Sequence, residues 1–244
     1  MPDAGGSTGD STHEVPGGGG PQITVARPDG PLWRVARPAN AIRFSEITAL
    51  DANEERAGNR FDVPGGGVLY CATHPIGAFT ETLVRLRPTK NADLLKAVEE
   101  DLGHHQMPAG GIPADWRDQR RKVRVAVAEN TLPFADVESE DTRAALSALM
   151  PDLLKDFRIP EIDVSVVRGP NRLITRAIAR YLYEAADEDG NLRYGGLRYL
   201  SKYGDHECWA IFDGAPVRDV EQKEIRKDDD DLKDVASRWG LTMH

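Results

Sequence analysis

Residues 58–88 constrain the fold more than any other part of the chain, because a buried strand there leads directly into an amphipathic helix. The apolar run VLYCAT follows a Pro/Gly-rich turn and is typical of a strand inside a sheet. Pro75 suits the first turn of a helix, and Pro88 ends the helical pattern. Apolar side chains recur between them at helical spacing: Ile76, Phe79, Leu83 and Leu86. The segment therefore predicts a loop, a strand, a tight connection and a helix.

Short strand-like and helix-like segments alternate loosely along the rest of the chain. Further strands are expected at 23–26, 32–36, 41–44, 122–128, 134–137, 162–167, 196–201 and 207–212. Helices are expected at 92–102, from a cap at Ser139 through a restart at Pro151, and after Pro170. Several strands follow one another too closely for helical crossovers. The pattern therefore favours an α+β fold with a mixed sheet over a doubly wound parallel sheet.

The composition divides the chain into one domain with additions. Residues 1–21 are rich in Gly, Ser, Thr, Asp and Pro, which bury little apolar surface, so a disordered leader is expected. Residues 22–220 are predicted to form one domain, in which the Gly/Pro-broken stretch 103–122 is typical of an insertion or a long surface loop. The charge run KDDDDLKD belongs to an acidic C-terminal extension at 221–244.

The charge balance and the cysteine count limit the environment of the protein. The formal net charge of −9 argues against direct binding of nucleic acid, because such binding draws on clustered Lys and Arg. No apolar run approaches the roughly 20 residues that cross a bilayer, and no signal peptide is evident, so we expect a cytoplasmic protein without membrane contact. Cys71 and Cys208 lie in apolar runs and are predicted to be buried free thiols.

The sequence motifs of several common functional sites are either absent or stand in an unsuitable context. No glycine-rich phosphate loop links a strand to a helix, and no G-x-S-x-G nucleophile elbow occurs. His104 and His105 are adjacent in an unpatterned stretch and lack the spaced partners of a zinc site. The Asp187–Gly190 run lacks the oxygen ladder of a calcium loop and is interpreted as a turn. We therefore expect no bound metal.

Glu81 stands out because of its position on the predicted helix. It lies about 140° round the helix from Ile76, away from the apolar stripe. The carboxylate therefore either faces solvent or lines a cleft on the other side of the helix. Arg60, before the glycine turn, and Tyr70, near the end of the strand, flank the same segment.

The order of these motifs resembles the RES domain, a family named for its Arg, Glu and Ser. The matching residues are Arg60 in GNRFD, Glu81 in AFTET and Ser201 in LRYLSKYG, with V-L-Y-x-A between the first two. The opening LWRVARP also resembles the first strand of the family, with Arg34 at its arginine. The resemblance spans roughly residues 32–213.

The resemblance implies a fold and a reaction. The implied fold is similar to that of ADP-ribosyltransferases, with a mixed, mainly antiparallel sheet and flanking helices. Members include the toxins of bacterial toxin–antitoxin pairs, which cleave the nicotinamide–ribose bond of NAD+ by hydrolysis or phosphorolysis. NAD+ is then a substrate, inorganic phosphate a candidate co-substrate and no cofactor is implied. The implied partner is a small DNA-binding antitoxin, and a homo-oligomer stays open.

The resemblance also implies roles for the matching residues. Arg60 and Arg34 are expected to bind the pyrophosphate, because a guanidinium donates paired hydrogen bonds to phosphate. Glu81 is expected to hold the ribose 2′-hydroxyl and to stabilise positive charge on the sugar. Tyr70 is expected to stack on nicotinamide or ribose, and Ser201 to bind the nicotinamide amide or a phosphate oxygen. Arg60, Glu81 and Ser201 are the predicted catalytic residues.

Two other functions use the same cleft. One is transfer of ADP-ribose to a macromolecule, which would label a protein or nucleic acid. The other is a non-catalytic RES module that binds NAD or a related nucleotide without turnover.

Overall fold

The computed structural model describes residues 22–48, 50–55, 57–88 and 110–244. The predicted leader at 1–21, the predicted helix at 92–102 and residues 103–109 of the stretch 103–122 lie outside the described residues. The described part of that stretch, 110–122, contains a short strand β5 (Gly111–Ile112), helix α3 (Ala114–Asp118) and the first residues of a long strand.

A nine-stranded mixed sheet forms the centre of the described structure. Its strands are β1 (Val25–Ala26), β2 (Leu32–Ala36), β3 (Ser45–Glu46), β4 (Gly67–Ala72), β6 (Arg121–Val127), β7 (Phe134–Asp136), β8 (Gly196–Leu200), β9 (Glu207–Phe212) and β10 (Val217–Glu224). Their order is β1-β7-β8-β9-β4-β2-β6-β10, with β3 beside β4. Only β7 and β8 pair in parallel in this sheet; its other pairs are antiparallel. The predicted α+β class with a mainly antiparallel sheet is confirmed.

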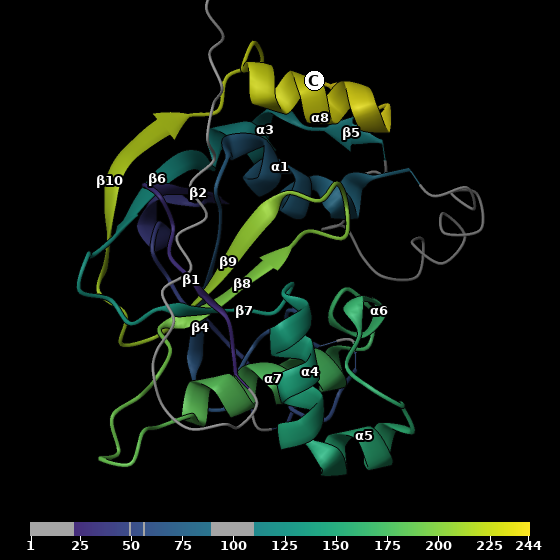
Figure 1. The fold of residues 1–244 in the computed structure, drawn as a ribbon. Helices are drawn as coiled ribbons and strands as arrows, with labels where there is room; N and C mark the ends of the chain where they lie inside the picture. The colour runs from purple at the N-terminus through teal and green to yellow at the C-terminus, as the bar shows by residue number, and fades with distance from the viewer. Residues whose placement is uncertain (1–21, 49, 56, 89–109) are drawn as a thin grey trace, which may run out of the picture.

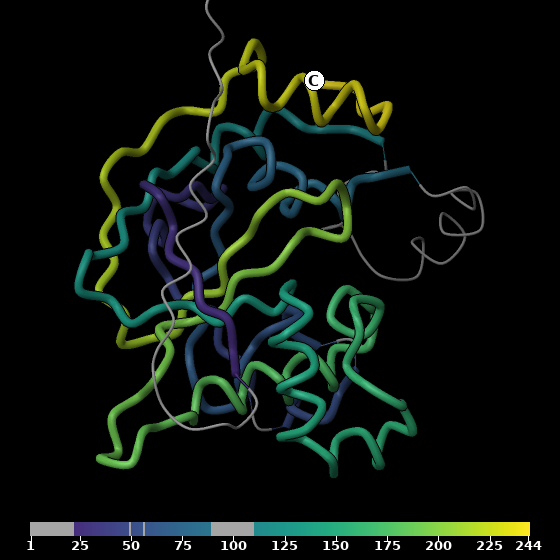
Figure 2. The backbone as a smooth tube through the Cα atoms, viewed as in Figure 1, coloured from purple at the N-terminus to yellow at the C-terminus, as the bar shows by residue number. Residues whose placement is uncertain are grey.

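The helices gather at two ends of the sheet (Figures 1 and 2). One group contains α1 (Pro75–Leu83), the 3-10 turn η2 (Val84–Leu86), α3 and α8 (Asp230–Trp239). The other contains α4 (Glu140–Leu149), α5 (Pro151–Phe157), α6 (Val164–Val167) and α7 (Arg172–Glu184). The first group buries Phe79 and Leu83 of α1 against Leu232 and Val235 of α8. The apolar face of α1 is therefore covered, and its opposite face is left for other contacts.

Residues 221–244, predicted as an acidic extension, supply the end of β10, helix α8 and the short strand β11 (Thr242–Met243). The Asp229 side chain accepts a hydrogen bond from the Leu232 backbone N–H, so it caps α8. Asp230 and Asp231 in the first turn suit the positive end of the helix dipole. The acidic run is therefore a helix start.

Three strand assignments differ from the structure. Residues 41–44 were expected to be a strand, but they form a turn after the 3-10 helix η1 (Pro38–Asn40), because the Ala41 and Arg43 N–H groups donate to the Pro38 and Asn40 carbonyls. Strand β3 begins only after this turn.

Residues 162–167 were expected to be a strand, but Val164–Val167 form α6. The reason is local: the Asp163 carboxylate accepts hydrogen bonds from the Val166 N–H at 2.9 Å and the Ser165 hydroxyl at 2.7 Å, which starts a helical turn. Strand β10 was not expected, because most of its side chains are polar and exposed, and its pairing with β6 forms it.

The structure also bears on the predictions about the two cysteines and about membrane-spanning segments. Cys71 and Cys208 are both buried and free, as predicted. Within the described ranges, no helix has the length and apolar content needed to span a bilayer.

Candidate active site

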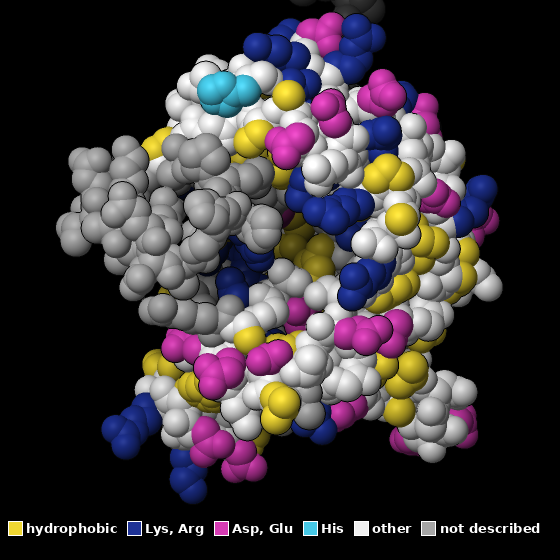
Figure 3. All heavy atoms as spheres, turned by 180° about the vertical axis from the view of Figure 1, so that it is seen from behind, with side chains coloured by type: hydrophobic (Ala, Val, Ile, Leu, Met, Phe, Trp, Pro, Cys, Tyr) yellow, Lys and Arg dark blue, Asp and Glu magenta, His cyan; other side chains and the backbone are white. Residues whose placement is uncertain are grey.

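A cleft of about 310 Å³ opens where β2, β4 and β8 meet α1. Its size falls in the range of small-ligand sites. The space-filling view shows a hollow on this face with Lys and Arg side chains around it (Figure 3). The lining residues are Trp33, Arg34, Val35, Arg43, Ser45, Asn59, Arg60, Val68, Tyr70, Cys71, Ala72, Ala78, Glu81, Thr82, Val84, Arg85, Arg172, Tyr199, Lys202 and Tyr203. Four of the five sequence-predicted site residues, all except Ser201, therefore meet in one cavity.

The loop that carries Arg60 is held by a fully buried carboxylate, that of Asp62. Asp62 accepts hydrogen bonds from the Asn59 N–H at 2.6 Å and from the Tyr70 hydroxyl at 2.8 Å. Gly58 has a φ of +60°, and a Cβ there would lie 2.6 Å from Asp62 Oδ2. The sequence GNRFD thus folds into a tight turn around its own Asp, which requires glycine at its start.

Arg60 is held from several sides. Its Nη2 donates to the Val167 carbonyl and its Nη1 to the Leu200 carbonyl at 3.5 Å. The guanidinium carbon also lies 5.2 Å from the centre of the Tyr199 ring, in cation–π range. Its Nε is buried and has no partner. Arg60 is therefore a fixed positive charge at the cleft wall, with both terminal nitrogens already bonded to protein.

Glu81 lines the cleft from α1, which decides between the two orientations that the helix geometry left open. Its Oε1 is buried and has no hydrogen-bond partner. A buried carboxylate oxygen without a donor is costly, so such atoms are rare in folded proteins unless a ligand supplies the donor. Glu81 is the one acidic side chain among the described residues that line the cleft.

Two tyrosines form part of the same wall. The Tyr70 hydroxyl donates to Asp62 and accepts from the Phe61 N–H at 3.1 Å, so its ring rather than its hydroxyl is offered to the cleft. Burial raises the pKa of Tyr70 well above its usual value, and Asp62 adds to the rise. Burial also raises the pKa of Tyr199, with Cys208 and Glu81 adding to it. Both phenols therefore stay protonated.

Tyr199 was not among the predicted site residues, although a signal for it existed. It stands two residues before Ser201 in the Y-x-S motif, and alternate residues of a strand share a face.

Ser201 is fully buried and is absent from the cleft lining. Its Oγ accepts a hydrogen bond from the Tyr203 N–H at 3.1 Å, and its N–H donates to the His206 carbonyl at 2.8 Å. Ser201 therefore closes the turn after β8. That turn presents Lys202 and Tyr203 to the cleft.

Positive charge dominates the cleft. Six Arg or Lys side chains and one carboxylate line it, although the whole chain is acidic. Arg34 donates to the Arg43 carbonyl at 3.2 Å, and burial lowers its pKa. The cations that the sequence reasoning missed are Arg43, Arg85, Arg172 and Lys202. These four cations come from four separate parts of the chain, so only the fold brings them together. Such a cleft suits an anionic ligand.

A metal site is not formed by the described residues. No group of three or more His, Cys, Asp or Glu side chains in those ranges is arranged to hold an ion. His104 and His105 lie outside the described residues. Asp187 accepts from the backbone of Asp189 and Asn191, which makes the predicted turn.

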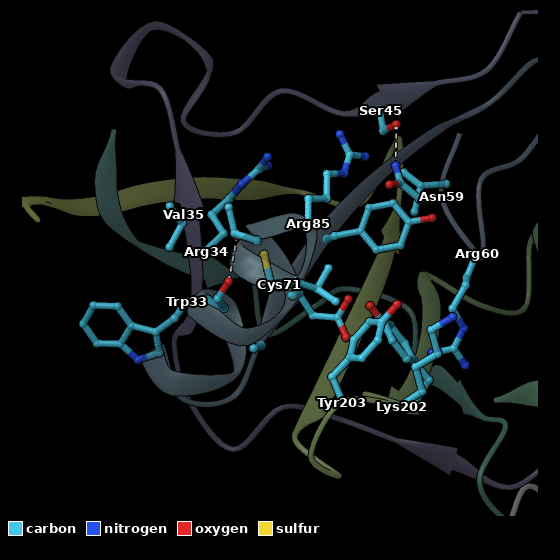
Figure 4. Close-up of a pocket in the computed structure, with 18 of the residues that line it drawn as sticks. Trp33, Arg34, Val35, Ser45, Asn59, Arg60, Cys71, Arg85, Lys202 and Tyr203 are labelled. Carbon is cyan, nitrogen blue, oxygen red and sulfur yellow. Dashed lines mark hydrogen bonds between the residues drawn. The ribbon is translucent and has the colours of Figure 1, made fainter. Parts of the chain in front are cut away.

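The close-up of the cleft shows how its labelled side chains are distributed (Figure 4). Arg34 and Arg85 lie on one side of the pocket, and Arg60 and Lys202 lie on the other. The two sides come from different parts of the chain: β2 and η2 for the first, and the loop before β4 and the turn after β8 for the second.

Comparisons with known proteins give one family match and a distant structural neighbour. A family model described as the RES domain matches residues 31–233. Among solved structures, the crystal structure of the M. tuberculosis MbcT–MbcA toxin–antitoxin complex is similar with a TM-score of 0.46 and 10% sequence identity. That alignment covers 86% of this chain and 88% of the other. The comparison with curated proteins finds no match.

Proposed function

This chain belongs to the RES domain family, and from this premise we propose that it cleaves the nicotinamide–ribose bond of NAD+. The observation that carries the proposal is the buried, unpartnered Oε1 of Glu81 in a cleft whose other charged side chains, among the described residues, are all cations. A dinucleotide fits this pattern, because it combines two negative phosphates with a ribose hydroxyl that can donate to a carboxylate.

The proposed reaction begins with breakage of the bond between C1′ of the ribose and the nicotinamide nitrogen. The bonding electrons leave with nicotinamide, which departs as a neutral molecule, and the ribose gains oxocarbenium character. Glu81 accepts a hydrogen bond from the 2′-hydroxyl and its negative charge stabilises the developing positive charge. An oxygen of water or inorganic phosphate then bonds to C1′. Water loses a proton to solvent and yields ADP-ribose, whereas phosphate yields the corresponding ribosyl phosphate.

The other residues support this reaction by position. The Tyr70 ring is free to stack on the nicotinamide or the ribose, since its hydroxyl is held by Asp62. Ser201 acts as a positioning residue, because it closes the turn that presents Lys202 and Tyr203. Arg60 contributes a fixed positive charge beside the cleft. Each terminal nitrogen donates one hydrogen bond to a backbone carbonyl, which fixes the orientation of the guanidinium and leaves a second N–H on each nitrogen for the pyrophosphate.

The family resemblance supports a further part of the proposal, that the protein is the toxin of a toxin–antitoxin pair. A small antitoxin that covers the cleft would then inhibit NAD+ cleavage. The test is co-purification of the protein with the product of a neighbouring reading frame, followed by the cleavage assay with and without that product. Full activity in the presence of a stoichiometric complex would contradict the proposal.

The central experiment measures NAD+ loss and nicotinamide release by chromatography, with and without phosphate. We expect Glu81→Gln to lower kcat by about 10²- to 10³-fold, as loss of one group that stabilises transition-state charge does elsewhere. Glu188→Gln is the matched control, because Glu188 is exposed and lies outside the cleft. Circular dichroism checks that each variant is folded. Intact NAD+ under both conditions, or full activity in folded Glu81→Gln, would refute the proposal.

A further inference from the structure

The cations of the cleft differ in how much of their hydrogen-bonding capacity the protein already uses. Arg60 is bonded to two carbonyls and lies over two aromatic rings, those of Phe61 and Tyr199. Lys202 lies 5.1 Å from the Tyr203 ring centre. These cations are on the side of the pocket opposite Arg34 and Arg85 in Figure 4.

Three arginines of the cleft form few hydrogen bonds with the rest of the protein: Arg34, Arg43 and Arg85. Arg34 makes one hydrogen bond, to the Arg43 carbonyl, and its buried Nε has no partner. Within the described ranges, none of the three guanidinium groups forms an ion pair with a carboxylate. Among the described residues, six cations share the cleft with the single carboxylate of Glu81, so an excess of positive charge remains and like charges repel one another. An anion bound between them removes this repulsion.

Glu81 and Arg85 have a spacing that usually gives an ion pair but does not do so here. They are four residues apart, and such pairs on a continuous helix have Cβ atoms about 5–6 Å apart. The chain changes from α1 to the tighter 3-10 turn η2 at Val84, which rotates Arg85 relative to Glu81. Glu81 Oε1 has no hydrogen-bond partner in the described part of the chain, and Glu81 forms no ion pair with Arg85. The Glu81 carboxylate and the Arg85 guanidinium therefore lie about one helical turn apart, and both line the cleft.

We propose that Arg43 and Arg85 join Arg34, for which the family resemblance already implies anion binding, in a phosphate-binding subsite on the side of the cleft away from Arg60. The inference rests on the proposed function for the identity of its main ligand. If Glu81 binds the ribose through its 2′-hydroxyl, the 5′-phosphate on the same sugar lies several ångströms from Glu81. Arg85 lies about one helical turn from Glu81, so it is placed to meet that phosphate. The ligand is a phosphate group, either from the diphosphate of the dinucleotide or from free inorganic phosphate.

The test measures binding, so it does not depend on turnover. The full chain and its Arg43→Gln and Arg85→Gln variants are titrated with ADP-ribose and with inorganic phosphate by calorimetry. Both arginines are exposed, so the fold should survive their replacement. Each lost charge-assisted hydrogen bond should weaken binding by about tenfold. Arg87→Gln is the matched control, because Arg87 is an exposed arginine two residues from Arg85 and outside the cleft lining.

The outcomes identify the source of the phosphate. They also distinguish a failure of the proposed subsite from a failure of the proposed function. Weaker ADP-ribose binding alone identifies the diphosphate, and weaker phosphate binding alone identifies free phosphate; either result supports the subsite. A change below twofold in both, an equal change in Arg87→Gln, or no binding of either probe by the unmodified protein would overturn it. If NAD+ is not cleaved but Arg85→Gln still weakens ADP-ribose binding, the subsite stands and the proposed function fails.

Discussion

Removal of the Asp62 carboxylate should unfold the loop that carries Arg60 and weaken the whole protein. Asp62 is fully buried and accepts from the Asn59 N–H, the Tyr70 hydroxyl, the Asn59 side-chain amide and the Ser45 hydroxyl. Asp62→Ala removes all four bonds, and the two shortest, from the Asn59 N–H at 2.6 Å and the Tyr70 hydroxyl at 2.8 Å, set the main cost. Their donors, the Asn59 N–H and the Tyr70 hydroxyl, are then left without this acceptor in the half-buried wall of the cleft.

The magnitude follows from the number of stranded donors. A hydrogen bond to a charged group contributes about 1.5–3 kcal/mol, so two such losses should lower the free energy of unfolding by about 3–6 kcal/mol. For a chain of this size, each kcal/mol shifts Tm by about 2–4 °C, so Tm should fall by roughly 10 °C. Asp62→Asn keeps one acceptor oxygen and the same shape, and should lose clearly less.

Urea denaturation followed by circular dichroism measures these free energies. A double-mutant cycle with Tyr70→Phe isolates the hydroxyl–carboxylate bond and should give a coupling energy of about 1.5 kcal/mol. An Asp62→Ala variant within about 0.5 kcal/mol of the unmodified protein, which is the scatter of surface substitutions, would refute this expectation.

Three other changes test separate parts of the fold. Gly58→Ala should destabilise the protein by about 1–3 kcal/mol, because its Cβ would meet the Asp62 carboxylate at a positive φ; urea denaturation measures this, and unchanged stability would contradict it. Cys71 and Cys208 should not react with a thiol reagent at pH 8 until denaturant is added, since burial raises the pKa of Cys71 to about 12. The unfolded thiol ionises first, so the free energy of unfolding should also fall as the pH rises above about 9. Leu232→Ala should cost about 2–5 kcal/mol, and a negligible loss would argue against packing of α8 on α1.

The parts of the fold that the sequence predicts well are those where local pattern and tertiary environment agree. Strand β4 and helix α1 were expected within a few residues of their bounds, because a continuous apolar run and a helical stripe each bury the face that the pattern indicates. Strand β10 has no such pattern, and only its pairing with β6 makes it a strand. At 162–167 the β-branched residues favoured a strand, but the capping bonds of Asp163 outweighed that preference.

The site was predictable where a residue stands beside a motif and unpredictable where distant segments meet. Arg34, Arg60, Tyr70 and Glu81 came from linear motifs, and the fold brings them to one cleft. Ser201 came from the same kind of motif, but its hydroxyl faces the turn rather than the cleft. Arg43 and Arg85 belong to no motif, and their importance follows only from the charge they add to a common cavity.

The packing of α8 on α1 matters during synthesis, because the two helices leave the ribosome at different times. Glu81 leaves the ribosome long before residues 230–239, so its helix first appears with Phe79 and Leu83 uncovered. Chains are synthesised at about 5–20 residues per second, so this interval lasts for roughly ten seconds or more. During that time the wall of the cleft lacks the helix behind it. A ribosome-bound chain should therefore carry all the motifs of the site and still lack its finished geometry.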